Sequence, residues 1–424
     1  MYNTNNILKG EISLNGDKSI SHRILMIASL IKEESVIYNL SNSEDVKTTI
    51  NCLRDCGVLI ESQLTGLDSS IYKIKGGKLR QPDNILNCQN SGSTARMLIG
   101  LLAGQGVRAS FNGDSSLIKR PMKRIIDPLV KMGVEITSDN YCLPININPH
   151  SIKPINYSIY TKSAQVKSSL MFAALGITQY SYISYSKQTR NHTEKILQYL
   201  DCDLKINDRI CIRKTRFLKG IKIQIPGDIS NAAFLIAASI IIPGSKIKLN
   251  NILFNSTRMA FIDILKKMGA KIKITNIDNK YCESTCSIES QFTHNLRAMK
   301  IDQSDIIQLI DEIPILCIVA TQAKGTTIIE DGEELRFKET DRISAIYENL
   351  KNMGADIREF KSGLAIKGQK KLYSANIKPF GDHRIAMSLE VLNFLVSNEY
   401  SGKFRNVIDI SFPGFYEIID YLKK

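Results

Sequence analysis

Hydrophobic positions along the chain follow a repeating pattern, in which a polar turn leads directly into a helix of small and apolar residues. In the first example, apolar residues recur at helical spacing from Ile20 to Ile31, after a polar start at Asp17. The pattern occurs six times, as "GDKSISHRILMIASL", "NSGSTARMLIGLLAG", "KSAQVKSSLMFAALG", "GDISNAAFLIAASII", "IDEIPILCIVATQAKG" and "GDHRIAMSLEVLNFL".

A second pattern alternates with the first and predicts amphipathic helices, each followed by a turn and a strand. Four of these helices end at Gly57, Gly133, Gly269 and Gly354, where a helix C-terminus favours a left-handed residue. The segments are "TINCLRDCGVLI", "IIDPLVKMGVEI", "KILQYLDCDLKI", "FIDILKKMGAKI" and "IYENLKNMGADI", and the chain ends in a sixth such helix, "FYEIIDYLKK".

Together the two patterns divide the chain into six repeats. One polar residue near the start of the first helix marks each repeat, and these markers are Ser21, Ser93, Gln165, Ser230, Asp311 and His383. Successive markers are separated by 72, 72, 65, 81 and 72 residues. Repeats with two helices and several strands predict an α/β architecture. We expect the first helix of each repeat to be buried and the second to be less buried. Six repeats split into two domains of three, with the boundary near Gly227.

The composition predicts a globular protein. The chain has 424 residues, of which 43% are hydrophobic and 23% charged, and it contains no run of about 18 uncharged apolar residues that could span a membrane. The N-terminus lacks a signal-peptide core. Nine scattered cysteines favour a reducing cytoplasm over a disulfide framework. Cys52 and Cys56, like Cys282 and Cys286, have no nearby histidine pair, which favours ordinary thiols over metal ligands.

The formal net charge of +14 admits nucleic acid, acidic surfaces or small anions as partners. The basic residues are spread along a chain that is rich in lysine, asparagine and isoleucine throughout, and the sequence contains no recognisable nucleic-acid-binding module. Charge alone therefore does not decide the class of partner.

The first predicted helix begins with an unusual set of polar residues. Lys18, Ser19 and Arg23 stand at its start, although a helix N-terminus already carries partial positive charge and disfavours cations. Two interpretations are open at this point. The segment is either a capped surface helix with two solvated cations, or a site where backbone N–H groups, hydroxyls and cations converge on an anion.

Eight motifs in order along nearly the whole chain resemble the 5-enolpyruvylshikimate-3-phosphate synthase family (3-phosphoshikimate 1-carboxyvinyltransferases), and several look closest to its bacterial class II. They are "GDKSISHR", "QNSGSTAR", "GDSSLIKRPM", "KSAQVKSSL", "TRNHTE", "DEIPILCIVATQAKGTT", "ELRFKETDRI" and "GDHRIAM". The resemblance implies the two-domain enolpyruvyl transferase fold, with six βαβαββ repeats, buried helices and a cleft between the domains. It also implies that residues 1–14 join 227–424 in the second domain, while 15–226 form the first.

The family reaction joins phosphoenolpyruvate to the 5-hydroxyl of shikimate 3-phosphate and releases phosphate, in the pathway to chorismate and the aromatic amino acids. Both substrates are polyanions, for which helix N-termini, hydroxyls, lysine and arginine are suitable ligands. For shikimate 3-phosphate the resemblance implies Lys18, Ser19, Arg23, Ser163, Ala164, Gln165, Arg190, Asp311 and Lys338. For phosphoenolpyruvate it implies Lys18, Gly92, Arg120, Gln165, Arg342 and Arg384.

The chemistry needs a proton delivered to the methylene carbon of phosphoenolpyruvate and another removed from the substrate hydroxyl. The resemblance implies that Glu339 carries the first proton and that Asp311 accepts the second. Lys338 and Lys18 complete the implied catalytic set, with Lys338 neutralising phosphate. No metal or cofactor is expected, and His383 is interpreted as structural.

Three positions bear on how this chain compares with its relatives. Ile410 replaces a lysine that some members carry before the "SFP" motif, and Glu334 replaces an asparagine that some members place against the shikimate ring. Gly92 is the glycine linked in this family to glyphosate, an inhibitor that occupies the phosphoenolpyruvate site, so we expect the native protein to be sensitive to it.

Two alternative functions were weighed against this one. A UDP-N-acetylglucosamine enolpyruvyl transferase is expected to have Lys-Asn near its N-terminus and often a loop cysteine, whereas here Lys18 precedes Ser19 and no cysteine stands beside Arg120. An RNA 3′-phosphate cyclase-like protein would share the repeats and the positive charge, and it predicts salt-dependent retention on polynucleotide. We expect a cytoplasmic monomer that acts on small molecules, without a nucleic acid or membrane partner.

Overall fold

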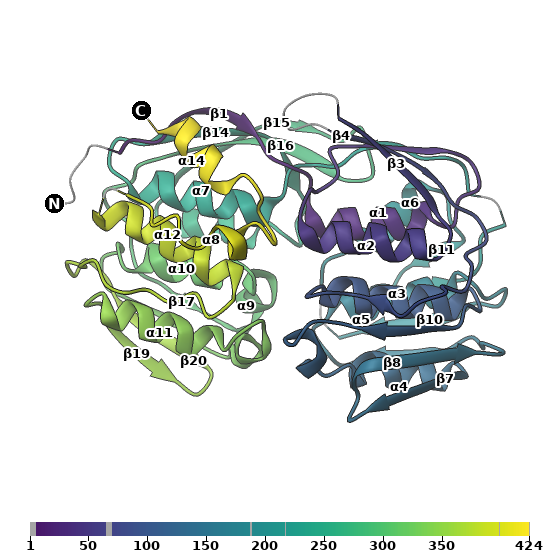
Figure 1. Ribbon diagram of the computed structural model, residues 1–424. Helices are drawn as coiled ribbons and strands as arrows, with labels where there is room; N and C mark the ends of the chain where they lie inside the picture. The colour runs from purple at the N-terminus through teal and green to yellow at the C-terminus, as the bar shows by residue number, and fades with distance from the viewer. Residues whose placement is uncertain (1–5, 65–69, 187–188, 217, 398, 424) are drawn as a thin grey trace. The chain divides into compact units, whose positions relative to one another are not determined.

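A computed structural model describes residues 6–64, 70–186, 189–216, 218–397 and 399–423 (Figure 1). The chain divides into two compact units. The N-terminal unit comprises Asn15–Ile225 together with Asn279–Glu283. The C-terminal unit comprises Met1–Leu14, Pro226–Asp278 and Ser284–Lys424.

The N-terminal unit is built around three helices that are shielded from solvent on nearly every face, as their small and apolar composition predicts. These are α1 (Lys18–Ala28), α3 (Gly92–Gly104) and α5 (Ala164–Ala174). Outer helices with exposed polar sides alternate with them, namely α2 (Glu44–Asp55), α4 (Lys123–Lys131) and α6 (His192–Tyr199), and a single 3-10 turn, η1 (Leu117–Lys119), precedes α4.

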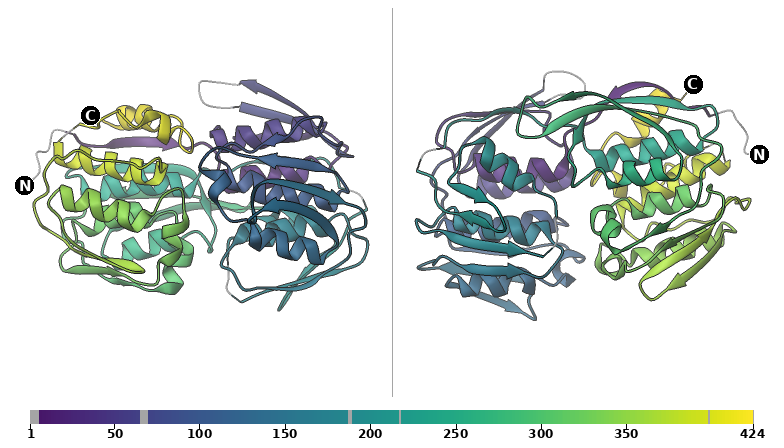
Figure 2. Two further views of the ribbon diagram at one scale, coloured as in Figure 1. Left: turned by 60° about the horizontal axis from the view of Figure 1, so that its bottom comes forward. Right: turned by 180° about the vertical axis from the view of Figure 1, so that it is seen from behind.

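Three four-stranded sheets complete this unit and lie on its outside (Figure 2). Each sheet has one parallel pair, formed by a strand at one edge and its neighbour, and its other pairs are antiparallel. The first sheet has the order β13 (Lys222–Gln224), β2 (Ser35–Tyr38), β4 (Ser70–Lys75), β3 (Leu59–Leu64). The second has the order β5 (Leu86–Asn87), β6 (Ala109–Asn112), β8 (Cys142–Pro149), β7 (Val134–Asp139). The third has the order β11 (Leu204–Ile206), β12 (Ile210–Ile212), β10 (Ser181–Tyr185), β9 (Asn156–Ile159).

The C-terminal unit repeats this plan. Its buried helices are α7 (Ile229–Ile241), α10 (Ile313–Ala320) and α12 (His383–Ser397). Its remaining helices are α8 (Ala260–Lys267), α9 (Gln303–Leu309), α11 (Arg342–Asn352), α13 (Arg405–Ile408) and α14 (Phe415–Leu422), with the 3-10 turn η2 (Glu333–Phe337). One sheet has the order β1 (Lys9–Ser13), β14 (Lys246–Phe254), β16 (Ser284–Gln291), β15 (Lys271–Asp278). The other has the order β17 (Lys300–Ile301), β18 (Thr326–Ile329), β20 (Gly363–Lys367), β19 (Asp356–Phe360).

The first strand of the chain completes a sheet whose other strands come much later in the sequence. β1 pairs in parallel with β14, with Lys9 opposite Lys246 and Ser13 opposite Asn250. The corresponding edge strand in the N-terminal unit is β13. It is the last strand of that unit in the sequence, and it also pairs with a strand that is distant in the chain.

The sixth repeat departs from the expected βαβαββ pattern. It has the buried helix α12 and the closing helix α14, but no strand is assigned after β20 in the part of the chain that the structure describes. The sequence before α12, "GQKKLYSANIKPFGD", is polar and shows little alternation of apolar and polar residues, so it lacks the signature of a half-buried strand. The described residues therefore form five four-stranded sheets, whereas six repeats were expected to supply six.

Small residues allow the buried helices α3 and α5 to pack closely. A Cβ added at Gly100 would lie 2.2 Å from the backbone oxygen of Ser169, and one at Gly104 would lie 2.5 Å from that of Ala173. Any side chain at these two positions would overlap the neighbouring backbone, so the glycines set the distance between the helices.

Candidate active site

Polar residues cap the N-termini of the three buried helices in the N-terminal unit. Asp17 accepts a hydrogen bond from the backbone N–H of Ile20 at 3.0 Å. Ser91 and Ser163 likewise accept hydrogen bonds from the third residues of α3 and α5. Each cap satisfies part of the first turn, and the N-terminal end of a helix remains favourable for an anion.

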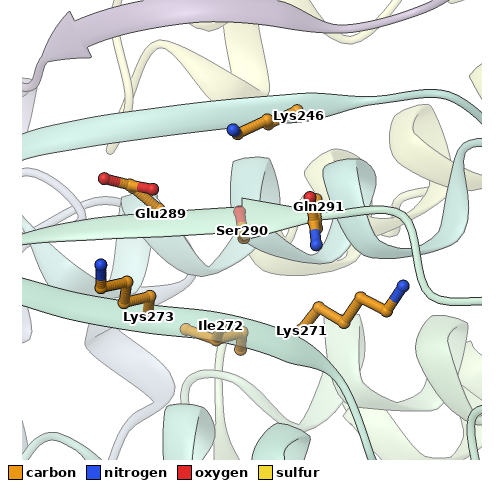
Figure 3. A pocket seen from close by; sticks show the side chains of 7 residues that line it. All are labelled: Lys246, Lys271, Ile272, Lys273, Glu289, Ser290 and Gln291. Atoms are coloured by element: carbon orange, nitrogen blue, oxygen red, sulfur yellow. The ribbon is translucent and has the colours of Figure 1, made fainter.

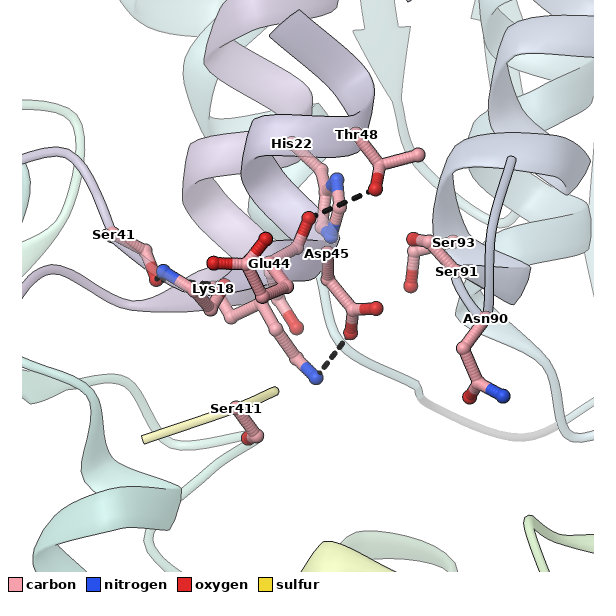
Figure 4. A network of polar contacts seen from close by, with 12 residues as sticks. Lys18, His22, Ser41, Glu44, Asp45, Thr48, Asn90, Ser91, Ser93 and Ser411 are labelled. Atoms are coloured by element: carbon pink, nitrogen blue, oxygen red, sulfur yellow. Dashed lines mark hydrogen bonds and ion pairs between the residues drawn. The ribbon is translucent and has the colours of Figure 1, made fainter. Parts of the chain in front are cut away.

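Lys18 is the first residue of α1, and Asp45 on α2 fixes its position (Figure 4). The distance between Lys18 Nζ and Asp45 Oδ2 is 2.6 Å, and both side chains remain partly exposed, at 16% and 13%. The carboxylate offsets the unfavourable placement of a cation at a helix N-terminus. Lys18 is therefore held in place while part of its side chain stays accessible.

Arg23 is buried one turn further along α1 and is held by groups from two other helices. Its Nε donates to Thr193 Oγ1 at 2.9 Å, and its Nη2 donates to Ser168 Oγ at 3.1 Å. Its Nη1 donates to the backbone oxygen of Ser19 at 2.7 Å, while Arg190 Nη1 donates to Ser19 Oγ at 3.2 Å. The structure thus brings Ser19, Arg23 and Arg190 together.

Gln165 stands in the first turn of α5 and connects it to α3. Its Oε1 accepts from Arg96 Nη1 at 3.0 Å, and its Nε2 donates to Ser93 Oγ at 2.9 Å. Ser163 and Ala164 are the N-cap and the first residue of the same helix. The side chain of Gln165 is therefore oriented by two residues of the "NSGSTAR" motif.

Gly92 is the first residue of α3 and lies against Arg96. A Cβ at Gly92 would lie 2.5 Å from Arg96 Nη1, which is closer than real Cβ atoms come to a neighbour. The glycine therefore leaves room for the guanidinium that holds Gln165.

Arg120 follows η1 in the same unit. Its Nη2 donates to Asn90 Oδ1 and to Ser116 Oγ, both at 3.1 Å. Asn90 in turn donates to Asp114 Oδ2 at 2.7 Å. These contacts fix the guanidinium beside the "QNSGS" segment that leads into α3.

In the C-terminal unit, Arg342 is the centre of a cluster of acidic residues. The guanidinium is almost fully buried and lies 2.8 Å from Asp382, 2.9 Å from Glu339 and 3.5 Å from Asp311. Burial disfavours the charged form, but the three carboxylates more than offset this and raise the pKa of Arg342. Two of the predicted acid–base residues, Asp311 and Glu339, are thus brought to one arginine.

Lys338 immediately precedes Glu339 and belongs to the same electrostatic environment. Burial lowers the pKa of Lys338 below its ordinary value of 10.5; the charge of Asp311 opposes this shift, and the charge of Arg342 adds to it. An ammonium group that loses its proton more readily than usual is better suited to proton transfer than an ordinary lysine.

Arg384 is buried at the start of α12, and only 4% of its surface is exposed. Its backbone N–H donates to Asp382 Oδ1 at 2.7 Å, and its guanidinium lies 5.7 Å from the centre of the Phe234 ring. Within the described residues, its buried Nε and Nη1 have no hydrogen-bond partner. A buried cation with open donors is the arrangement expected of an anion-binding group.

The two departures from the family pattern lie in the C-terminal unit. Ile410 is half-buried and precedes Ser411, whose backbone oxygen accepts a hydrogen bond from Asn231 Nδ2 at 3.4 Å. Glu334 lies on η2 and is exposed.

Several residues that shape this site were not predicted from the sequence. Asp45, Arg96 and Asp382 each hold one of the predicted residues, and they were missed because no local pattern marks a partner that is distant in sequence. Asp382 had one available signal, because it stands in the "GDHRIAM" motif directly before a helix, which is a common N-cap position.

Other kinds of site were also sought. Among the described residues no group of histidine, cysteine or acidic side chains could hold a metal ion, and no helix is long and apolar enough to cross a membrane. All nine cysteines are free thiols. A surface pocket of about 310 Å³ on β14, β15 and β16 is lined by Lys246, Lys271, Lys273 and neighbouring residues (Figure 3). None of the predicted site residues lines it.

Comparison with known proteins gives the same family along the whole chain. The family model of EPSP synthase (3-phosphoshikimate 1-carboxyvinyltransferase) matches residues 2–419. This chain is also similar to proteins named 3-phosphoshikimate 1-carboxyvinyltransferase. One of them, from Streptococcus agalactiae, is 42% identical over 98% of both chains. Another, from Persephonella marina, is 39% identical over 97% of this chain and 96% of its own.

Solved structures support the same assignment. EPSP synthase from Acinetobacter baumannii matches with a TM-score of 0.86 and 32% identity, covering 100% of this chain and 97% of its own. The enolpyruvyl transferase NikO from Streptomyces tendae matches with a TM-score of 0.76 at 13% identity, over 100% of this chain and 97% of its own, which indicates a shared fold. The α/β enolpyruvyl transferase fold expected from the motifs is thereby confirmed. The chain belongs to the EPSP synthase (3-phosphoshikimate 1-carboxyvinyltransferase) family.

Proposed function

We propose that this protein transfers the enolpyruvyl group of phosphoenolpyruvate to the 5-hydroxyl of shikimate 3-phosphate and releases phosphate, in the pathway to chorismate. Family membership supports the reaction. The observation that carries the proposal is Arg384, a buried guanidinium whose Nε and Nη1 meet no acceptor in the described residues. A bound carboxylate or phosphate would supply the acceptors that these donors lack.

In the N-terminal unit, shikimate 3-phosphate is assigned to the N-terminal ends of α1 and α5 and to Arg190. Ser163, Ala164 and Gln165 open α5, while Ser19 and Arg23 lie in the first turns of α1. The guanidinium of Arg190 adds a positive charge next to Ser19. Hydroxyls and arginines that are already held in position lose little side-chain freedom when an anion binds.

Phosphoenolpyruvate is assigned to the remaining cations. Arg120, Arg342 and Arg384 offer planar guanidinium groups that match carboxylate and phosphate oxygens. A glycine at position 92 allows close approach of the backbone, and Lys18 and Gln165 are assigned to both substrates. Arg342 also forms an ion pair with Glu339. The same arginine is therefore assigned both to binding phosphoenolpyruvate and to orienting the residue that delivers the proton.

The reaction then needs two proton transfers. Asp311 accepts the proton of the 5-hydroxyl as the oxygen attacks the central carbon of phosphoenolpyruvate, and Glu339 delivers a proton to the methylene carbon. In the elimination step Glu339, now a carboxylate, takes a proton back from the methyl group, the double bond forms again, and phosphate departs with the proton held by Asp311. Lys338 and Lys18 neutralise the phosphate charge as it develops.

No metal or cofactor is part of this proposal, because proton transfer and charge neutralisation by the residues above account for each step. A monomer in the cytoplasm, with small-molecule partners, stays a prediction from the sequence.

The proposal is tested by following phosphate release from phosphoenolpyruvate with purified protein. Shikimate 3-phosphate should support turnover, whereas UDP-N-acetylglucosamine should give only the background rate. The same samples should show thermal stabilisation by shikimate 3-phosphate and none by polynucleotide. Turnover with UDP-N-acetylglucosamine, or stabilisation by polynucleotide alone, would favour one of the alternative functions.

A further inference from the structure

A short segment of the chain clusters with a different unit from the strands on either side of it. β15 and β16 belong to the C-terminal unit, but the residues between them, Asn279–Glu283, cluster with the N-terminal unit. The last of these residues, Glu283, is buried, and only 1% of its side chain is exposed. A buried carboxylate in a turn between two strands requires partners, because an unpaired charge in the interior is strongly unfavourable.

Two partners of Glu283 come from the first turn of α6. His192 Nδ1 lies 2.6 Å from Glu283 Oε1, and Lys195 Nζ lies 3.4 Å from Glu283 Oε2. His192 and Lys195 are three residues apart and therefore lie on the same face of the helix. The two oxygens of a single carboxylate thus hold one face of this turn.

The other two residues of the turn contact α1 and α5. Thr193 Oγ1 accepts from Arg23 Nε at 2.9 Å and lies 2.7 Å from Ser168 Oγ. Glu194 forms a buried ion pair with Lys167 of α5. All four residues from His192 to Lys195 are therefore engaged in polar contacts.

Arg190 lies just before this turn, two residues ahead of His192, and donates to Ser19 Oγ at 3.2 Å. The helix itself is short, with eight residues from His192 to Tyr199, and its buried apolar residues are Ile196 and Leu197. A small apolar contact does little to fix the rotation and axial position of a helix. The polar contacts of the first turn consequently determine where Arg190 and Thr193 stand.

We propose that Glu283 is a positioning residue for shikimate 3-phosphate, acting through His192 and Lys195 on the first turn of α6. It holds Arg190 at the substrate and keeps Thr193 in contact with Arg23, without touching substrate itself. This role rests on the proposed function, since it assigns shikimate 3-phosphate to the same arginines.

The test compares Glu283→Ala with the native enzyme by steady-state kinetics and by calorimetric titration with shikimate 3-phosphate. Loss of a hydrogen bond between charged groups predicts a rise of about tenfold in KM and Kd for shikimate 3-phosphate. KM for phosphoenolpyruvate should stay within about twofold, because the contacts described above for its arginines do not involve α6. Glu283→Gln, which keeps an acceptor for His192, should restore most of the affinity, and it provides a folded variant if Glu283→Ala is unstable.

Glu390→Ala is the matched control. Glu390 is a buried carboxylate of the C-terminal unit, where it accepts from Ser401 and Tyr416, and its truncation should lower the melting temperature while leaving both KM values unchanged. The proposal is overturned if Glu283→Ala changes neither KM, raises both by the same factor, or matches Glu390→Ala in its kinetics. Failure of the native protein to bind shikimate 3-phosphate would overturn the proposed function and this role together.

Discussion

Arg23 and Arg120 of the N-terminal unit differ from Arg342 of the C-terminal unit in the groups that hold them. In the N-terminal unit, Arg23 and Arg120 donate to hydroxyl, amide and backbone oxygens, which leave the positive charge of the guanidinium in place. In the C-terminal unit, Arg342 is surrounded by three carboxylates. Neutral partners suit a group that must attract a polyanion, whereas carboxylates beside a cation supply proton acceptors of controlled basicity.

This difference suggests a division of labour. Most residues assigned to shikimate 3-phosphate lie in the N-terminal unit, and both acid–base residues, Asp311 and Glu339, lie in the C-terminal unit. Variants in the two units should therefore fail in different ways, with weakened binding on one side and slow chemistry on the other.

The largest effect is expected for Glu339→Gln. The amide keeps an acceptor for Arg342 but cannot donate the proton, so turnover should fall by about 10²- to 10⁴-fold, as is typical of general acid–base groups. Binding of shikimate 3-phosphate, measured by calorimetry, should persist. Glu333→Gln, at an exposed position on η2, is the control and should be active. A Glu339→Gln enzyme with most of its turnover would show that another residue delivers the proton.

The next largest effect is a difference in stability between variants of two buried arginines. Arg342→Met leaves Asp382 buried without its cation and should destabilise the protein by about 3–5 kcal/mol. Arg384→Met removes a cation whose Nε and Nη1 have no partner in the described residues, so it should raise the melting temperature of the ligand-free protein while weakening phosphoenolpyruvate binding. Thermal unfolding of both variants without ligand measures the contrast. A loss of stability in Arg384→Met would contradict the interpretation of this arginine as an unsatisfied anion ligand.

A smaller effect is expected for Gly92→Ala. The added methyl group must displace the guanidinium of Arg96, which holds Gln165, and overpacking of this kind costs about 1–3 kcal/mol, or roughly 5- to 150-fold in affinity. We expect the native enzyme to be sensitive to glyphosate and the variant to lose more affinity for this longer molecule than for phosphoenolpyruvate. Inhibition assays in competition with phosphoenolpyruvate decide this, and equal inhibition constants would remove steric fit as the explanation.

The smallest effect concerns pH. The folded pKa of Lys338 is below 10.5, so kcat/KM should decline on the alkaline side as pH rises through that lowered value. Between the folded pKa and 10.5 the unfolded chain binds the proton more tightly, so the unfavourable contribution of Lys338 to stability diminishes as pH rises through this window. Lys338→Arg stays charged and should shift the alkaline limb of the profile to higher pH. If the alkaline decline of kcat/KM is the same in Lys338→Arg, a group other than Lys338 causes that decline.

Much of the fold was accessible from the sequence because it depends on local patterns. The buried helices, the glycines that end the outer helices and the polar caps are set by residues within a few positions of one another. The sixth repeat was the exception, since its helices follow the pattern but its intervening segment does not.

The candidate site was less predictable because its contacts join distant residues. Lys18 and Asp45 are 27 residues apart, Arg342 and Asp382 are 40 apart, and Arg96 and Gln165 are 69 apart. One member of each pair, Lys18, Arg342 or Gln165, was predicted from the sequence, and its partner became evident only from tertiary packing. Glu283 was missed for the same reason, because it lies in a turn without any motif.

The position of β1 in its sheet has a consequence for how the chain folds as it is synthesised. β1 precedes Asn15–Ile225 in the chain, but its partner β14 follows only after the whole of that segment has been synthesised. The sheet of β13, β2, β4 and β3 can be completed as soon as β13 has been synthesised. Domains generally fold as units during translation. The nascent N-terminal segment must therefore wait unpaired, as an exposed strand edge, until the second half of the protein arrives.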